Sequence, residues 1–143
     1  MRKQRLGLVA LFGSVLTLSA CGGPPTEEIE DYDQFQETIN ADDFTGFAFY
    51  IYGSDVEEAK ENVFQAFEGT GETLTYTNSL KYDEAMQERA NESGRPADMI
   101  APSDEVVFIE NGELLDEYEV DGDDIKQEEY EGELQSFVEK YAE

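Results

Sequence analysis

One thiol and many carboxylates are the side chains of this 143-residue chain that could do chemistry. The thiol belongs to Cys21, which follows an apolar stretch, and the carboxylates belong to 35 Asp and Glu residues. The sequence has no histidine. Histidine-based catalytic triads and histidine metal sites are therefore excluded. A lone cysteine also excludes a disulfide within the chain, and no cofactor is expected.

Cys21 stands at the end of a segment with the features of a signal peptide. Arg2, Lys3 and Arg5 form a basic tip, and residues 6–18 form an apolar stretch that is short for a membrane-spanning helix. The run Leu18-Ser19-Ala20-Cys21-Gly22 resembles the lipobox of bacterial lipoproteins. This resemblance implies that residues 1–20 are removed and that Cys21 carries lipid such as palmitate. The protein would then be held at the extracytoplasmic face of the cell membrane.

The charge of the processed chain excludes one class of partner. Without residues 1–20 the chain keeps all 35 acidic residues and six of its nine basic ones, so its net charge is −29. Nucleic acid is excluded because its phosphates require cationic side chains. The acidic residues are spread along the whole processed chain, which is typical of a solvated shell that preserves solubility. Cation binding is the alternative interpretation.

The processed chain is organised as a short tether and one domain. Residues 21–30 contain paired glycines and paired prolines and predict a flexible tether. Residues 31–143 are enough for one small domain with its own core. The nearly all-apolar run 46–52 predicts a central strand, and residues 73–78 alternate as a second strand.

The remaining elements follow from turn residues and helical spacing. Asn111-Gly112 lies between the strand-like runs 105–109 and 114–120 and predicts a hairpin. Helical spacing of apolar residues predicts four helices. They cover residues 31–40, a segment capped by Ser54 or Asp55 and ended by Gly69, residues 80–91, and residues from about 124 onward. This order predicts an α/β fold with a mixed sheet and helices on both faces.

The order of elements resembles thioredoxin over residues 31–143. The aromatic strand 47–52 runs into a turn and a helix, as the strand before the thioredoxin active site does. The run 106–113 resembles the family's apolar strand and its Asn-Gly-Glu hairpin, and Leu134 with Phe137-Val138 resembles the closing helix. The resemblance implies a thioredoxin-like mixed sheet flanked by helices.

The departures from the family concern its active site. The family has Cys-x-x-Cys at the start of the helix after the central strand, where this chain has Gly53-Ser54-Asp55-Val56-Glu57-Glu58 and no cysteine. A seryl or aspartyl oxygen cannot replace a thiolate in disulfide exchange, so the protein is not expected to be a thiol-disulfide oxidoreductase. The family also has a cis-proline directly before its third strand. Pro102 is the candidate, although the hairpin alignment puts Asp104 at that position.

Two regions offer candidate binding residues. Gly53, Ser54 and Asp55 begin a predicted helix, whose free backbone amides could bind a peptide backbone or a carboxylate beside Pro102. The alternative is a capped helix without a ligand. Asp121, Asp123 and Asp124 gather oxygen ligands, but their spacing does not fit an EF-hand, and a turn with a helix cap is the simpler interpretation.

Tyrosines and paired carboxylates leave two further alternatives. Six tyrosines could line a face that binds glycans, and the alternative is that they are half-buried parts of the structure. They are Tyr50, Tyr52, Tyr76, Tyr82, Tyr118 and Tyr130. The first hypothesis for function is a non-catalytic, peptidoglycan-associated lipoprotein that binds or scaffolds envelope proteins or cell-wall material. The second is a cell-wall-acting enzyme with a carboxylate-based or metal-assisted site. The lack of Cys and His beyond the signal peptide weighs against the second hypothesis.

Overall fold

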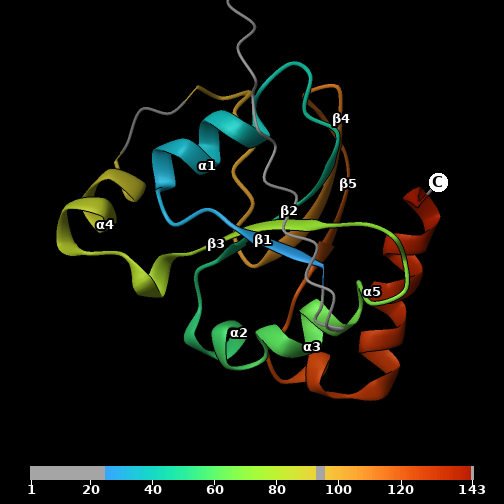
Figure 1. Cartoon of the computed structure of the whole chain (residues 1–143). Coiled ribbons are helices and arrows are strands. Elements are labelled where there is room, and N and C mark those ends of the chain that lie inside the picture. Colours follow the sequence, from blue (N-terminus) through green and yellow to red (C-terminus); the bar gives the residue numbers. More distant parts are fainter. Residues whose placement is uncertain (1–24, 93–95, 143) are drawn as a thin grey trace, which may run out of the picture.

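A five-stranded mixed sheet with helices on both faces forms the centre of the molecule (Figure 1). The computed structural model describes residues 25–92 and 96–142. The predicted signal peptide, Cys21 and the first residues of the predicted tether lie outside this part. The strands are β1 (Thr26–Glu28), β2 (Gly46–Ile51), β3 (Leu74–Asn78), β4 (Glu105–Glu110) and β5 (Glu113–Glu119). Their order, β1-β3-β2-β4-β5, confirms the predicted α/β fold with a mixed sheet.

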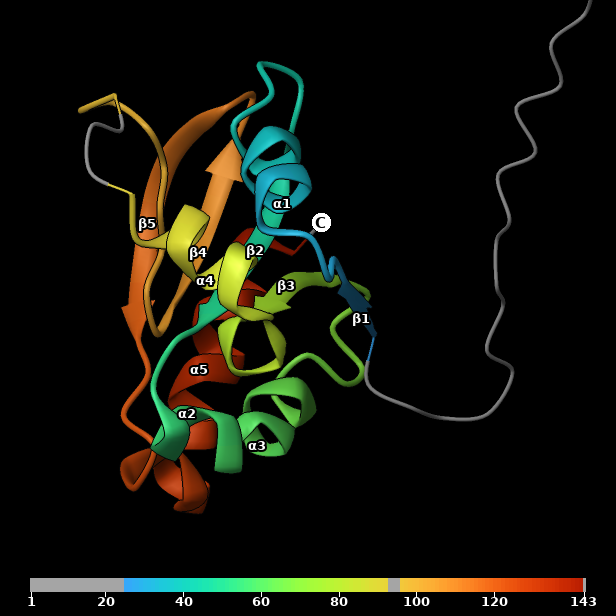
Figure 2. The same ribbon diagram turned by 90° about the vertical axis from the view of Figure 1, so that its left-hand side faces the viewer.

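Helices of different length cover the two faces of the sheet. α1 (Tyr32–Ile39) and α4 (Glu84–Ala90) lie on one side, and α2 (Ser54–Glu58), α3 (Lys60–Gln65) and α5 (Glu128–Tyr141) lie on the other (Figure 2). Two 3₁₀ turns, Ser79–Lys81 and Asp124–Lys126, precede α4 and α5. Each face therefore has its own hydrophobic cluster, and the sheet separates the two.

Strand β2 is the central strand that the apolar run predicted. It pairs in parallel with β3 and antiparallel with β4. Phe47, Phe49 and Ile51 belong to the cluster beneath α2, α3 and α5, whereas Ala48 and Tyr50 belong to the cluster beneath α1. Burial on both faces explains why this strand has no polar alternation.

Strand β1 was not expected, because it lies within the predicted tether. Thr26–Glu28 pairs in parallel with β3, and the amide of Ile29 donates to the carbonyl oxygen of Tyr76 at 2.8 Å. Ile29 is only 8% exposed. Residues 26–29 therefore belong to the folded domain and not to a flexible tether.

Two predicted helices are divided. The segment after Gly53 forms α2 and α3, with Ala59 between them, and its N-cap is Gly53, so neither Ser54 nor Asp55 caps it. The segment 80–91 begins as a 3₁₀ turn and then continues as α4, whose N-cap is Asp83. The carboxylate of Asp83 accepts a hydrogen bond from the amide of Met86 at 2.8 Å. A side-chain cap inside a helical pattern gives the backbone a second starting point.

The C-terminal half follows the prediction closely. Asn111 and Gly112 have φ of 50° and 76°, as a two-residue type I′ hairpin requires. The closing helix α5 begins at Glu128, after a 3₁₀ turn, and buries Leu134 and Val138. The ring of Tyr141 stacks on Phe108 of β4 with 4.2 Å between the centroids.

Candidate functional site

The turn between β2 and α2 is held by a carboxylate from a distant part of the chain. Oδ1 of Asp104 accepts from the amide of Tyr52 at 2.8 Å. Oδ1 and Oδ2 of the same residue lie 3.1 and 3.0 Å from the amide nitrogen of Gly53. Of the amides at which a ligand was expected, that of Gly53 is therefore already bound by the carboxylate of Asp104.

Asp104 itself is fixed by its backbone. Its amide donates to the carbonyl oxygen of Tyr50, and its carbonyl oxygen accepts from the amide of Val120, each at 2.9 Å. Its φ is 54°, a conformation that non-glycine residues adopt rarely and that Asp tolerates better than most. These bonds connect the end of β2 to the residue that follows β5.

Close packing continues around Gly53 and Gly122. A Cβ on Gly53 would lie 2.7 Å from Oδ1 of Asp55 and 3.1 Å from Oδ2 of Asp104. A Cβ on Gly122 would lie 2.5 Å from the backbone carbon of Asp55. Glycine is therefore required at Gly122, where the close atoms are backbone, whereas at Gly53 the side chains of Asp55 and Asp104 would have to shift.

The four predicted surface residues do not share one cavity. Ser54 and Asp55 are exposed at the start of α2, and Pro102 is buried. Pro102 lines two cavities that none of Gly53, Ser54 and Asp55 lines. The described residues contain no cis peptide bond, so the bond between Ala101 and Pro102 is trans.

One of these cavities is a hollow of about 440 Å³ beside the end of β2. Tyr52, which is 53% exposed, stands in its wall with the ring of Tyr50 6.3 Å away. Gln36 of α1 and Asn91 after α4 also line it. The hollow offers aromatic and amide groups, but no described basic residue lines it.

The second cavity is larger, about 690 Å³, and we call it the acidic groove. It lies between the segment 97–102 and the hairpin of β4 and β5; Figure 2 shows that segment in amber beside β5. Val107 and Leu114 provide apolar lining from the sheet. Four carboxylates line it as well: Asp98, Glu105, Glu113 and Glu117.

Glu105 has the most perturbed environment among these carboxylates. Burial raises its pKa above the ordinary value, and the nearby charges of Glu117, Glu119 and Asp104 raise it further. Glu105 pairs with Glu119 across β4 and β5, and Val107 pairs with Glu117. Glu105, Glu117 and Glu119 therefore lie side by side on one face of the hairpin. No basic residue is part of the described lining of the groove.

The candidate metal ligands form a turn. Oδ1 of Asp121 accepts from the amides of Asp123 and Asp124 at 2.9 and 3.0 Å. The amide of Ile125 donates to the carbonyl oxygen of Asp121 at 2.9 Å. Within residues 25–92 and 96–142, no group of three or more His, Cys, Asp or Glu side chains has an arrangement that could hold a metal ion.

The six candidate tyrosines are divided between the two faces of the sheet. Tyr50 and Tyr82 belong to the cluster under α1, with Tyr52 next to Tyr50. Tyr76, Tyr118 and Tyr130 belong to the opposite cluster. They do not form one aromatic face, because Tyr76 is next to Phe64 in the core on the other side.

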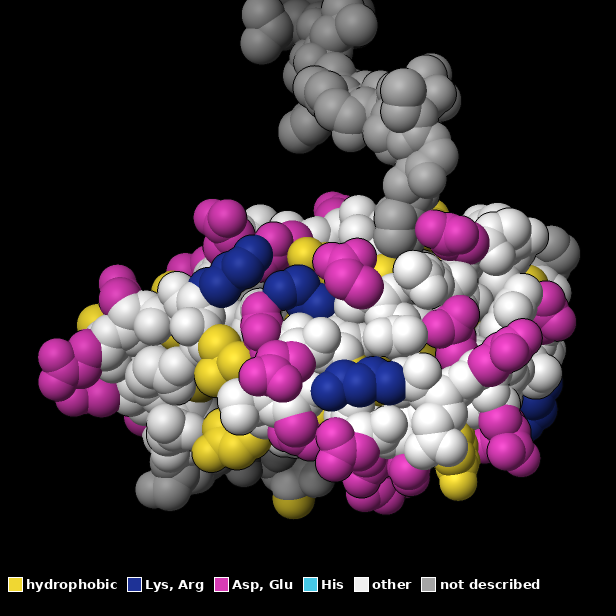
Figure 3. All heavy atoms as spheres, turned by 90° about the horizontal axis from the view of Figure 1, so that it is seen from below, with side chains coloured by type: hydrophobic (Ala, Val, Ile, Leu, Met, Phe, Trp, Pro, Cys, Tyr) yellow, Lys and Arg dark blue, Asp and Glu magenta, His cyan; other side chains and the backbone are white. Residues whose placement is uncertain are grey.

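Basic side chains in the described part of the chain are all engaged. Each lies within 4.0 Å of a carboxylate: Lys60 near Glu57, Lys81 near Glu28, Arg89 near Asp33, Lys126 near Asp123 and Lys140 near Asp116. Figure 3 shows the face seen from below, where Asp and Glu side chains are widely spread with a few basic side chains between them. The remaining carboxylates form a strongly negative surface.

The sequence interpretation missed both the Asp104 contact and the acidic groove. The only available signal for Asp104 was its place before the strand that begins at Glu105, where the resemblance expects a proline. The signal for the groove was a strand-like run in which the acidic residues Glu113 and Glu117 lie close to the apolar residue Leu114.

Comparisons with models of known protein families, with curated proteins and with solved structures find no match. None of the helices in the described ranges has the length and apolar character that crossing a membrane requires.

Proposed function

We propose that this protein is a lipid-anchored extracytoplasmic lipoprotein whose thioredoxin-like domain has no redox activity and acts by binding at the cell envelope. The sheet order β1-β3-β2-β4-β5 carries the domain part of the proposal. The three neighbouring strands β1, β3 and β2 are parallel, β4 is antiparallel to β2, and β5 is antiparallel to β4, as in a thioredoxin-like sheet. This arrangement supports the resemblance that the sequence suggested.

The turn after β2 supports the absence of redox activity. This turn and the first residues of α2 contain Gly53, Ser54 and Asp55, and none of them provides a thiolate for attack on a disulfide. Asp104 holds the amides of Tyr52 and Gly53, so the turn is stabilised by a charged contact within the chain. Reduction of insulin disulfides by the purified protein should equal the buffer control, and faster reduction would contradict this part of the proposal.

Cys21 and its basic, apolar leader support the anchor. The test is fractionation of cells that produce the protein with Cys21→Ala, compared with Ala20→Gly, which keeps a small residue before the cysteine. The parent and Ala20→Gly should remain with the membrane and incorporate labelled fatty acid, whereas Cys21→Ala should lose the label. Equal membrane retention and an equal lack of label in all three would contradict the anchor.

A carboxylate-based hydrolase acting on cell-wall material is the second candidate, favoured by one observation. Glu105 has a raised pKa and lines the acidic groove of about 690 Å³, and both features suit a general acid. Release of soluble fragments from purified cell wall by the protein, abolished by Glu105→Gln, would favour this candidate. No release above that of the Glu105→Gln variant would favour binding.

A further inference from the structure

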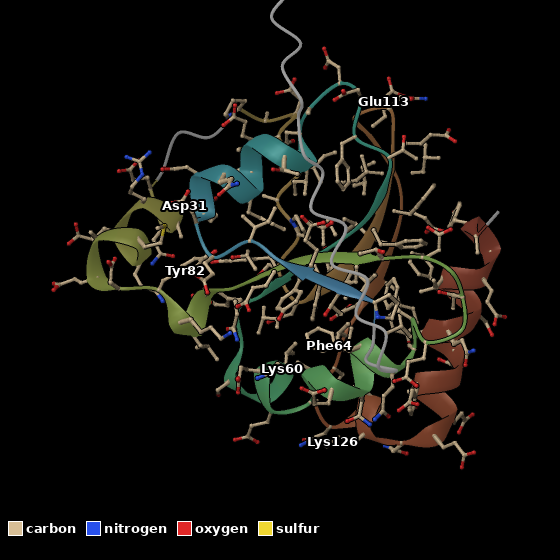
Figure 4. All side chains as sticks on the ribbon, viewed as in Figure 1. Asp31, Lys60, Phe64, Tyr82, Glu113 and Lys126 are labelled. Atoms are coloured by element: carbon tan, nitrogen blue, oxygen red, sulfur yellow. The ribbon has the colours of Figure 1, made fainter. Side chains whose placement is uncertain are left out.

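The acidic groove combines three features that point to one kind of ligand: uncompensated charge, an exposed apolar side chain and a free strand edge. Its charge comes from Asp98, Glu105, Glu113 and Glu117, and no basic residue is part of its described lining. The described lysines and Arg89 form ion pairs at other places on the surface. Figure 4 shows Glu113 at the end of the sheet that is remote from Lys60 and Lys126.

An exposed leucine lies at the same place. Leu114 is 45% exposed and lines the groove together with Val107. A side chain of this size gains free energy when it leaves water, so the edge of the groove favours an apolar contact. A small cation would satisfy the carboxylates and leave Leu114 in water.

Strand β5 offers a backbone template. It is an edge strand of seven residues, the longest in the sheet, and no strand in the described part of the chain pairs with its outer side. Edge strands left unpaired accept an extended segment of another chain through main-chain hydrogen bonds. Exposed lysines usually protect such edges, but β5 carries Glu and Asp instead.

The charge decides which extended segment fits. A second copy of this protein would bring more carboxylates to a groove that is already negative, on a chain of net charge −29 after processing. A basic segment would neutralise the cluster around Glu105, where like charges lie close together.

We propose that the acidic groove binds an extended basic segment of a partner protein as an added strand beside β5. Lysine or arginine side chains of that segment face Glu105, Glu113 and Glu117, and an apolar side chain packs on Leu114. This inference rests on the proposed binding function and assigns it a surface and a class of partner.

The probe is a synthetic peptide that alternates lysine with valine, and its affinity for the full-length protein in detergent is measured by calorimetry. The double variant Glu117→Gln with Leu114→Ser should weaken binding about tenfold or more, because it removes a charge and an apolar contact at the centre of the groove. Both side chains belong to exposed residues, and a melting curve checks that the variant keeps its fold. The matched control is Glu129→Gln with Leu80→Ser, which removes the same charge and an equally exposed leucine outside the groove.

A second probe tests the added strand. The same peptide with methylated backbone nitrogens keeps its charge but cannot donate main-chain hydrogen bonds, so its affinity should also fall about tenfold. Equal loss in the groove and control variants, or equal affinity of the methylated peptide, would overturn the proposal in favour of general charge attraction. Stronger competition by calcium than by sodium at equal ionic strength, without any effect of Leu114→Ser, would overturn it in favour of a cation site. Fractionation of cells that produce Cys21→Ala tests the lipid anchor separately. A negative binding result for the acidic groove can therefore be distinguished from a negative result for the anchor.

Discussion

The carboxylate of Asp104 faces the amide of Gly53, with its two oxygens 3.1 and 3.0 Å from the nitrogen. The two residues are 51 positions apart in the chain. The resemblance to thioredoxin expects a proline at the position of Asp104, and it expects the redox motif in the stretch that begins at Gly53. The pair is a structural contact that ties the residue before β4 to the turn after β2.

Asp104→Ala should destabilise the protein by about 1–3 kcal/mol, because it leaves two backbone amides without their charged acceptor. Asp104→Asn should cost less, since its amide oxygen can still accept and Asn tolerates a positive φ. Urea unfolding of the three proteins measures both values. Equal stability of the Ala and parent proteins would show that the contact contributes nothing.

Strand β1 should contribute to stability, contrary to a free tether. Ile29→Ala should destabilise by about 2–5 kcal/mol, the usual cost of removing a buried isoleucine side chain. Glu27→Ala is the control, because Glu27 lies in the same strand and is exposed. A cost for Ile29→Ala no larger than that of the control would mean that residues 26–29 do not pack on the domain.

The ionised carboxylate of Asp116 should stabilise the attachment of α5, and acid pH should weaken this attachment. Hydrogen bonds from Tyr141 and then Lys140 lower the pKa of Asp116 to about 2. A carboxyl group whose pKa is lower in the folded state stabilises the fold at pH values above its unfolded pKa, which is about 4 for Asp. For Asp116 this stabilisation is lost as the pH falls through its folded-state pKa of about 2.

The variant Asp116→Asn should therefore be less stable than the parent at pH 6, and the difference should shrink between pH 4 and pH 2. Melting temperatures across this pH range measure it. A difference that stays constant over the range would show that ionised Asp116 is not the cause.

Salt should stabilise the domain through screening. The net charge is −26 for the full chain and −29 without residues 1–20, so repulsion between surface carboxylates opposes the compact state at low ionic strength. Screening acts beyond about 10 Å at 0.1 M salt and beyond about 3 Å at 1 M. The melting temperature should rise with sodium chloride and equally with potassium chloride.

Calcium at matched ionic strength separates screening from a specific site. A large, saturable increase in melting temperature with calcium would point to bound metal, first at Asp121, Asp123 and Asp124, because a ligand of the folded state stabilises it by mass action. No increase with sodium would contradict the solvated-shell interpretation.

Local signals in the sequence predicted the elements that depend on local physics. The run 46–52 predicted β2 because a strand buried on both faces has no polar positions. Asn111-Gly112 predicted the hairpin because both residues adopt a positive φ readily. These features are encoded within a few residues, so no knowledge of the partner strand was needed.

The features that sequence reasoning missed depend on contacts between distant segments. Thr26–Glu28 is polar and short, and it becomes a strand only because the edge of β3 is available. Asp104 and Gly53 meet only when β4 lies beside β2. The acidic groove requires the register of β4 and β5, which places Glu105 opposite Glu119 and Val107 opposite Glu117.

The mass of the N-terminal peptide of the protein extracted from membranes tests the proposed anchored state most directly. The account predicts that this peptide begins at Cys21 and carries the added mass of lipid on that residue. A peptide that retains residues 1–20, or one that begins at Cys21 with an unmodified thiol, would contradict it.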